Sequence, residues 1–103
     1  MTDDIWSAAH WCRSVGVRRG SLVGVRVQDA AYRFEVARVT HVGRCLVVGA
    51  SVGTVYPRGR RGCGGPAVEA SGDYEQSWAF ASQLFAPAGD LLDAVVAWME
   101  RGG

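Results

Sequence analysis

The chain contains no lysine, no asparagine and a single isoleucine, whereas arginine, alanine, glycine and valine are abundant. This bias is typical of a GC-rich coding sequence, so the use of arginine instead of lysine carries no argument about function. The absence of lysine does exclude the phosphate-binding loop of P-loop NTPases, because that motif requires one. Only the placement of the arginines is therefore informative.

Cysteines and long apolar runs are also scarce. Three cysteines, separated by 33 and 18 residues, form an odd and widely spaced set, which argues for reduced thiols and against a disulfide framework. The longest apolar stretch, residues 46–55, is interrupted by glycine and hydroxyl residues and is too short to span a bilayer. Because the N-terminus opens with two acidic residues and shows no signal segment, we expect a cytoplasmic protein without membrane contact.

The length and composition predict one folded domain. A chain of 103 residues is the size of a single domain, so we assign residues 1–103 to one unit. Hydrophobic residues make up 49% of the chain, which is typical of a protein with a core and not of a disordered one. The four tryptophans leave room for one at an interface, either with a partner protein or in a homodimer.

Charge is distributed unevenly along the chain. Residues 1–65 carry ten arginines against four acids, a net charge of +6, whereas residues 66–103 carry one arginine against six acids, a net charge of −5. The whole chain has a formal net charge of only +1. Such polarity predicts either an anionic partner for the basic half or docking of the basic half onto the acidic one.

Helical periodicity marks both ends of the chain. Residues 2–15 show one apolar face, with Thr2 as the expected cap and Gly16 as the expected end of the helix. Residues 73–101 return to the same periodicity, and Pro87 interrupts them. We therefore expect an N-terminal helix and a C-terminal αα-hairpin.

The middle of the chain, residues 21–56, has the alternating pattern of β-strands. Val23 and Val25 alternate with polar residues, and the run that starts at Tyr32 directs its aromatic side chains toward the core. Gly43 suits a hairpin turn because glycine tolerates a positive φ. Residues 45–48 read as a third strand, and residues 54–56 could form a fourth. This pattern predicts an antiparallel meander of three or four strands.

The predicted fold class is α+β, with an N-terminal helix, a bent antiparallel sheet of three or four strands and a C-terminal αα-hairpin. Glycines at intervals inside strands indicate bulges or sharp bends, which a small closed barrel requires. In glycine placement and strand count, residues 21–56 resemble SH3-like small barrels in a generic way. That resemblance implies a closed sheet, and it includes no diagnostic motif.

No pattern in the sequence supplies a catalytic or metal-binding constellation. Residues 49–53 match G-x-S-x-G, but a nucleophile elbow needs a helix directly after it, and the next residues are strand-like. Cys63 has no positioned base in the sequence around it. We therefore expect a protein that is not an enzyme and holds no metal or cofactor. The two His/Cys pairs, whose spacing differs from that of familiar zinc sites, are His10 with Cys12 and His41 with Cys45.

The arginine- and glycine-rich loop at residues 57–65 is the strongest functional signal. Planar guanidinium groups suit phosphate recognition, and the glycines between them let the backbone approach a ligand closely. Arginines before and within the predicted strands extend this basic surface. The candidate contact residues are Arg18, Arg19, Arg26, Arg33, Arg58, Arg60 and Arg61.

Two classes of function remain open. We expect a small binding protein that contacts nucleic acid through the basic sheet and loop, with Tyr32, Phe34 or Tyr56 available for base stacking. The alternative is an adaptor or inhibitor, of the immunity or anti-defence type, that grips a larger protein through its charge asymmetry or an exposed tryptophan. A plainer alternative is that the arginines pair with the acidic C-terminal part of the same chain.

Overall fold

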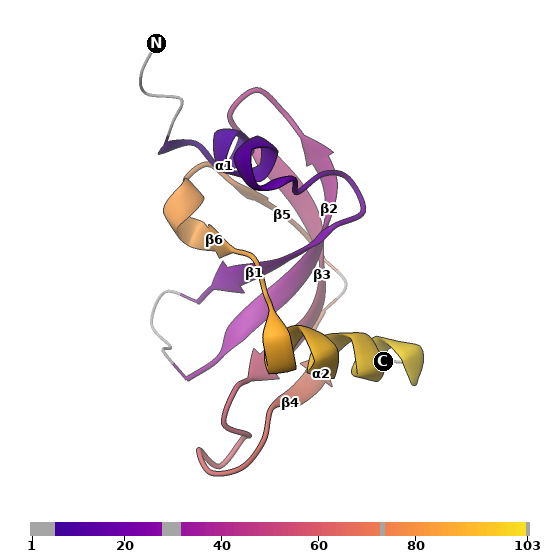
Figure 1. The fold of residues 1–103 in the computed structure, drawn as a ribbon. Helices are drawn as coiled ribbons and strands as arrows, with labels where there is room; N and C mark the ends of the chain where they lie inside the picture. Colours follow the sequence, from indigo (N-terminus) through magenta and orange to yellow (C-terminus); the bar gives the residue numbers. More distant parts are fainter. Residues whose placement is uncertain (1–5, 28–31, 73, 103) are drawn as a thin grey trace.

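The computed structural model describes residues 6–27, 32–72 and 74–102, and it has an α+β fold (Figure 1). The six strands that these residues form make one antiparallel sheet in the order β4-β3-β2-β1-β6, with β5 paired to β3 beside β4. No helix among the described residues is long and apolar enough to cross a membrane. The elements in chain order are α1 (Ala8–Val15), β1 (Leu22–Arg26), β2 (Phe34–Val42), β3 (Val47–Tyr56), β4 (Ala67–Ala70), β5 (Glu75–Trp78), the 3-10 helix η2 (Ala81–Gln83), β6 (Leu84–Phe85) and α2 (Gly89–Glu100).

The central hairpin of β2 and β3 is bent at two places. Between Val36 and Ala37 of β2 the register skips Val52 of β3, and between Val39 and His41 it skips one residue of β2. Each extra residue bends its strand and increases the local twist, as expected from the glycine spacing. The sheet nevertheless stays open, with β4 and β5 along one edge and β6 at the other, so closure into a small barrel is not confirmed.

Glycines within the strands make room for aromatic rings. A Cβ atom at Gly49 would come within 2.8 Å of the Trp78 ring and 2.9 Å of the Arg38 carbonyl oxygen. None of the three strand glycines concerned has a positive φ, so their role is to provide space. The three glycine–aromatic pairs are Gly24 with Phe85, Gly49 with Trp78 and Gly53 with Trp98.

Two clusters of buried side chains hold the helices on the sheet. The α1 cluster joins Ala8, Ala9 and Cys12 to valines of β1, β2 and β3, and the α2 cluster joins Val95 to the β2 residues Phe34 and Val36. Leu84 and Phe85 are neighbours in β6 but belong to different clusters. Because successive strand residues point to opposite faces, both faces of the sheet carry a core at this position.

The N-terminal helix is confirmed, with a different start. Ser7 is the N-cap, and its hydroxyl accepts a hydrogen bond from the His10 backbone nitrogen at 3.1 Å. The expected cap, Thr2, lies outside the described residues. Gly16 ends the helix in the left-handed conformation, with φ of 81°, as the sequence predicted.

The expected strand region is confirmed with three corrections. The two strands expected between Cys45 and Tyr56 form one continuous strand, β3. Gly43 does begin the β2–β3 turn, where its backbone nitrogen donates to the Leu46 carbonyl at 2.8 Å, but it does so without a positive φ. Tyr32, expected to face the core, has 67% of its surface exposed.

The expected C-terminal αα-hairpin is wrong. Residues 75–85 form β5, the short 3-10 helix η2 and β6, and the only α-helix that the structure describes in this part of the chain is α2, which begins after Pro87. The apolar spacing in this segment fits a helix, but its bulky aromatic residues also suit strands. Backbone pairing with the free edge of β3, from Val47 opposite Trp78 to Ala50 opposite Glu75, decides the outcome.

Candidate functional site

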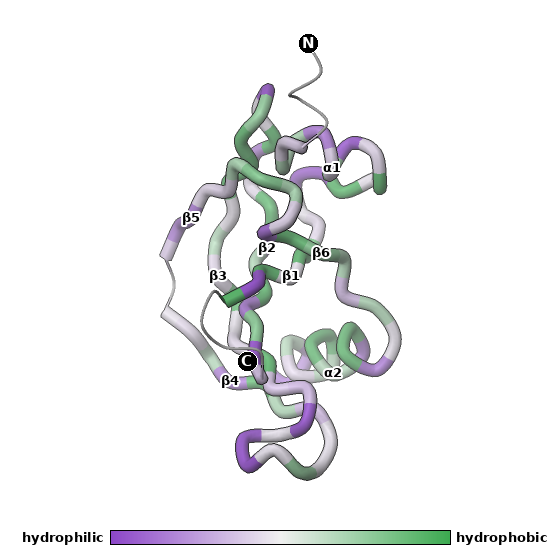
Figure 2. Tube along the Cα trace, turned by 90° about the vertical axis from the view of Figure 1, so that its left-hand side faces the viewer, coloured by the Kyte–Doolittle hydropathy of each residue, from purple (hydrophilic) through white to green (hydrophobic). Residues whose placement is uncertain are grey.

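The arginine-rich loop and the start of β2 lie at the same end of the sheet. Phe34 pairs with Arg26 on β1 and with Val55 on β3, so Arg33 and the residues after Tyr56 extend from that end. In Figure 1 this is the lower end, away from α1. Figure 2 shows hydrophilic residues on the loop that follows β3, again at the far end from α1.

Two tyrosines stack at this end. The ring centroids of Tyr32 and Tyr56 are 6.4 Å apart, with an angle of 25° between the planes. We call them the tyrosine pair. The Tyr56 ring is half-buried, whereas Tyr32 is 67% exposed, so the pair presents one flat aromatic surface to solvent. Offset aromatic stacking is favourable, and an exposed ring held by a second ring is a ready surface for another flat group.

Each ring of the tyrosine pair also has a guanidinium group over it. The Cζ atom of Arg33 lies 5.7 Å from the centroid of Tyr32, and that of Arg60 lies 5.9 Å from the centroid of Tyr56. Both distances are within the range of cation–π attraction. The result is a small surface on which positive charge and aromatic rings are interleaved.

Arg33 contributes a buried donor that lacks an acceptor. Its Nε is buried and has no hydrogen-bond partner among the described residues. A buried donor left unpaired costs about 1–3 kcal/mol, and more when it carries charge.

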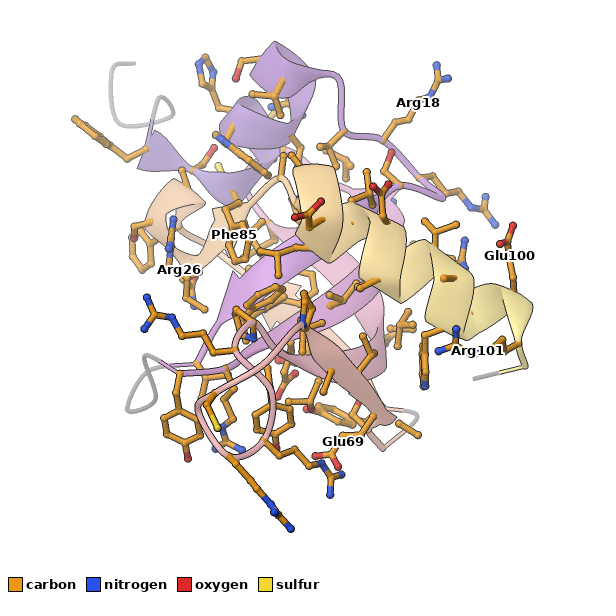
Figure 3. All side chains as sticks on the ribbon, turned by 60° about the horizontal axis from the view of Figure 1, so that its bottom comes forward. Arg18, Arg26, Glu69, Phe85, Glu100 and Arg101 are labelled. Carbon is orange, nitrogen blue, oxygen red and sulfur yellow. The ribbon has the colours of Figure 1, made fainter. Side chains whose placement is uncertain are left out.

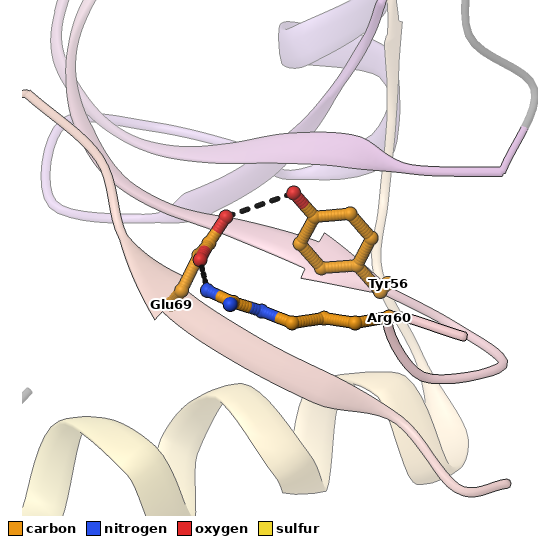
Figure 4. A network of polar contacts seen from close by, with 3 residues as sticks. All are labelled: Tyr56, Arg60 and Glu69. Carbon is orange, nitrogen blue, oxygen red and sulfur yellow. Dashed lines mark hydrogen bonds and ion pairs between the residues drawn. The ribbon is translucent and has the colours of Figure 1, made fainter. Parts of the chain in front are cut away.

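Arg60 is positioned by an acid of the neighbouring strand. Its guanidinium forms an ion pair with the Glu69 carboxylate, and the Tyr56 hydroxyl donates to Glu69 Oε1 at 2.8 Å (Figure 4). The side chains of Arg60 and Glu69 are 62% and 33% exposed, so the pair contributes at most about 1 kcal/mol to folding. The arginine thus pairs within its own chain, as the plainer alternative expected, but with a residue of β4 and not of α2.

A preformed hollow of about 330 Å³ lies beside the tyrosine pair. Two tight turns shape the loop that encloses it, since Gly59 N donates to Tyr56 O at 3.0 Å and Gly62 N donates to Gly59 O at 3.2 Å. Both glycines have positive φ, 77° and 78°, which other residues adopt only with strain. The volume lies within the range of small-ligand pockets. The hollow is lined by Tyr32, Pro57, Arg58, Gly59, Arg60 and Gly62.

The structure separates the seven arginines that the sequence grouped together. Arg33, Arg58 and Arg60 surround the tyrosine pair and the hollow, and Arg61 is exposed on the same loop. Arg26 instead turns toward the β6 side, where its Nε donates to the Ser82 carbonyl at 3.1 Å and its guanidinium lies 5.0 Å from the Phe85 ring centroid (Figure 3).

Arg18 and Arg19 lie elsewhere, in the connection between α1 and β1. In Figure 3, Arg18 points outward on the α1 side, whereas Glu69 marks the opposite end of the molecule. The single basic surface expected from the sequence is therefore corrected to two basic regions. Backbone hydrogen bonding sets this division. Gly20, the residue after Arg19, donates to the carbonyl of Val39, which lies in the half of β2 farther from the tyrosine pair.

Of the three aromatic residues expected to serve for stacking, one is excluded. Phe34 is buried and packs edge-on against Phe85, with ring centroids 4.9 Å apart. Glu69 is the residue of the candidate site that the sequence did not reveal. Nothing in its local pattern signals the contact with Arg60, which depends on the pairing of β3 with β4.

The G-x-S-x-G pattern lies inside a strand and not in an elbow. Ser51 is buried in β3 and shares a hydrogen bond with the Ser71 hydroxyl. Burial raises the pKa of the Cys12 thiol, which keeps it protonated and unreactive at neutral pH. Among the described residues, no three or more His, Cys, Asp or Glu side chains gather as metal ligands.

The chain matches no family model, no curated protein and no solved structure. The chemistry of the candidate site therefore follows from its geometry. That geometry combines an exposed ring, several guanidinium groups and an ordered glycine loop, which together can hold a flat group and an anionic group side by side.

Proposed function

We propose that this protein binds single-stranded nucleic acid at the tyrosine pair and the adjoining loop. The observation that supports the proposal is the exposed Tyr32 ring, stacked on Tyr56 and flanked by Arg33 and Arg60. A base stacks on the outer face of Tyr32, and its phosphates contact the surrounding guanidinium groups.

The chemistry favours a single strand over a duplex. Bases in a duplex are already stacked on their neighbours, whereas an unpaired base can turn its face toward a protein ring. Stacking of one base on an aromatic side chain contributes about 1–3 kcal/mol. Because every base has such a face, we expect little sequence preference, and affinity is set by the number of phosphates that the arginines reach.

The salt dependence of binding tests this proposal. If Arg33, Arg58 and Arg60 neutralise about three phosphates, the logarithm of the binding constant for a single strand should fall with the logarithm of salt concentration at a slope of about −2. Fluorescence anisotropy with a labelled oligonucleotide measures that slope. Replacing Arg58, Arg60 and Arg61 with alanine should flatten it and leave the melting temperature almost unchanged, because exposed charges contribute little to folding.

A matched control uses an arginine at the other end of the sheet. Arg44 is exposed on the β2–β3 turn, so Arg44→Ala changes the net charge as much as Arg58→Ala does. The proposal requires Arg58→Ala to weaken binding more than Arg44→Ala. Absence of any binding by the unaltered protein at low salt would remove the nucleic-acid function altogether.

The second candidate, binding to a larger protein, is favoured by exposed aromatic residues near α1. Trp6 and Phe80 are 69% and 62% exposed, and Ser7, next to Trp6, forms an isolated bridge with Phe80. Large exposed aromatic side chains are typical of interfaces. Affinity purification after nuclease treatment tests this candidate. Recovery of a stoichiometric protein partner, and its loss when Trp6→Ala and Phe80→Ala are combined, would support this candidate over nucleic-acid binding.

A further inference from the structure

A second basic hollow lies at the end of the sheet remote from the tyrosine pair. Its volume is about 380 Å³, slightly more than that of the first. It is formed where the end of α1, the connection to β1 and the last residues of β2 meet. The hollow is also lined by two valines. Its polar lining residues are Arg13, Arg18, Arg19, Thr40 and His41.

Arg13 is fixed in place by the turn between β2 and β3. Its Nη1 donates to the Gly43 carbonyl at 2.9 Å, and its Nη2 donates to the Arg44 carbonyl at 3.0 Å. These acceptors hold the guanidinium group but carry no net charge. Arg13 therefore brings an oriented positive charge to the rim of the hollow, and no acid among the described residues forms an ion pair with it.

The backbone that carries Arg18 and Arg19 is also ordered. Arg18 N donates to the Ser21 hydroxyl at 3.1 Å, and Ser21 N donates back to the Arg18 carbonyl at 2.9 Å. Gly20, with φ of 94°, donates to the Val39 carbonyl at 2.7 Å. Because this turn is already in place, a ligand that binds Arg18 and Arg19 has only their side chains to order.

None of the acids that the structure describes neutralises the hollow. Its lining includes no carboxylate, and the ion pair between Arg60 and Glu69, at the other end, is the only one among the residues that the structure describes. The Thr40 hydroxyl already donates its hydrogen to the Val48 carbonyl at 3.2 Å, so the arginines are the main hydrogen-bond donors to a ligand in the hollow. Three arginines line this one concavity, and their charges create a positive potential that attracts a multivalent anion.

We propose that this hollow binds a phosphate group. Guanidinium groups match the oxygens of phosphate through paired, charge-assisted hydrogen bonds, and a tetrahedral dianion can accept them from several directions at once. Arg18 and Arg19 supply the flexible contacts, Arg13 the fixed one, and the His41 ring a further donor. The site shares no residue with the tyrosine pair or its loop, so it stands or fails independently of nucleic-acid binding there.

Titration with inorganic phosphate, followed by backbone amide NMR at constant ionic strength, tests the proposal. We expect saturable shifts at the amides of Arg18–Ser21 and of His41, and combined Arg18→Ala and Arg19→Ala should weaken binding about tenfold for each arginine lost. Combined Arg58→Ala and Arg61→Ala, which makes the same charge change at the other end, should leave the affinity unchanged. An unaltered spectrum for the rest of the chain checks that the variants fold. Shifts that do not saturate, or that both double variants reduce equally, would overturn the proposal.

Short oligonucleotides identify the source of the phosphate. Tighter binding of a 5′-phosphorylated trinucleotide than of its 5′-hydroxyl form, read at the same amides, would assign the hollow to a terminal phosphate. Equal binding of both forms would assign it to the phosphodiester backbone. Tyr32→Ala, which removes the stacking ring at the other end, should leave these shifts in place, so failure here and failure of the proposed function are distinguishable.

Discussion

If Arg60 binds a phosphate as proposed, the Glu69 carboxylate competes with that phosphate for the Arg60 guanidinium group. In the free protein the carboxylate holds Arg60 against Tyr56, and a ligand must displace or share that contact. An exposed ion pair of this kind contributes about 0–1 kcal/mol. Removing the charge with Glu69→Gln should therefore strengthen binding of a single-stranded oligonucleotide by a factor of up to about five.

The same substitution should leave the salt dependence unchanged and spare the fold. Arg60 is already one of the three arginines expected to contact phosphate, so the slope of log affinity against log salt should stay at about −2 while the affinity rises at every salt concentration. The glutamine side-chain oxygen can still accept from the Tyr56 hydroxyl, so we expect the free energy of unfolding to fall by less than about 1 kcal/mol. Anisotropy titrations at several salt concentrations, with thermal melting of the free protein, measure both quantities.

A matched control separates this local effect from a general change of charge. Glu75 is an exposed acid on β5, where its neighbour across the sheet is Ala50 of β3, so Glu75→Gln alters the net charge equally at another place. The competition account predicts a clear gain for Glu69→Gln and little for Glu75→Gln. Equal gains for both, or weaker binding by Glu69→Gln, would refute it.

The remaining predictions concern packing and thiol chemistry. Gly49→Ala should lower the free energy of unfolding by about 1–3 kcal/mol, because the new methyl group meets the Trp78 ring at 2.8 Å. Gly65→Ala is the control, since a Cβ atom there has nothing within 4 Å and should have little effect. Urea unfolding measures both changes. In the native protein at neutral pH, iodoacetamide should label the exposed Cys63 and spare Cys12, and mass spectrometry of the digested protein reads the ratio. Burial raises the pKa of Cys12 above its ordinary value of 9.0, so the thiol stays protonated and does not affect stability below that pH. As the pH rises above 9.0, the unfolded chain loses this proton more readily than the folded one, and the free energy of unfolding falls. Cys12→Ala should reduce that fall, which urea unfolding at several pH values measures.

The fold elements that the sequence predicted are those set by local pattern. Alternation through Val23, Val25 and Val36 marks the strands, and Gly16 marks the end of α1, because these signals lie within a few residues of one another. The apolar spacing of segment 75–85 fits both the helical and the strand period, so the local pattern predicts a helix where the structure has strands. Only the distant edge of β3 selects the strand, and local sequence does not contain that information.

The candidate site was partly predictable for the same reason. Arg58 and Arg60 stand out in the sequence because they lie within one short glycine-rich loop. The separation of Arg18 from that loop follows from the order in which the strands pair, and the contact of Glu69 with Arg60 follows from the pairing of β3 with β4. Tertiary pairing therefore decided which of the charges meet.

The most direct test of nucleic-acid binding at the tyrosine pair compares two substitutions of Tyr32. Tyr32→Phe keeps the ring that a base would stack on, and Tyr32→Ala removes it, while neither changes the charge. Because the side chain is 67% exposed, neither change should affect folding strongly. In anisotropy titrations with one single-stranded oligonucleotide, we predict near-normal affinity for Tyr32→Phe and a loss of about 5- to 150-fold for Tyr32→Ala. Equal affinity for the two variants would contradict the proposed function.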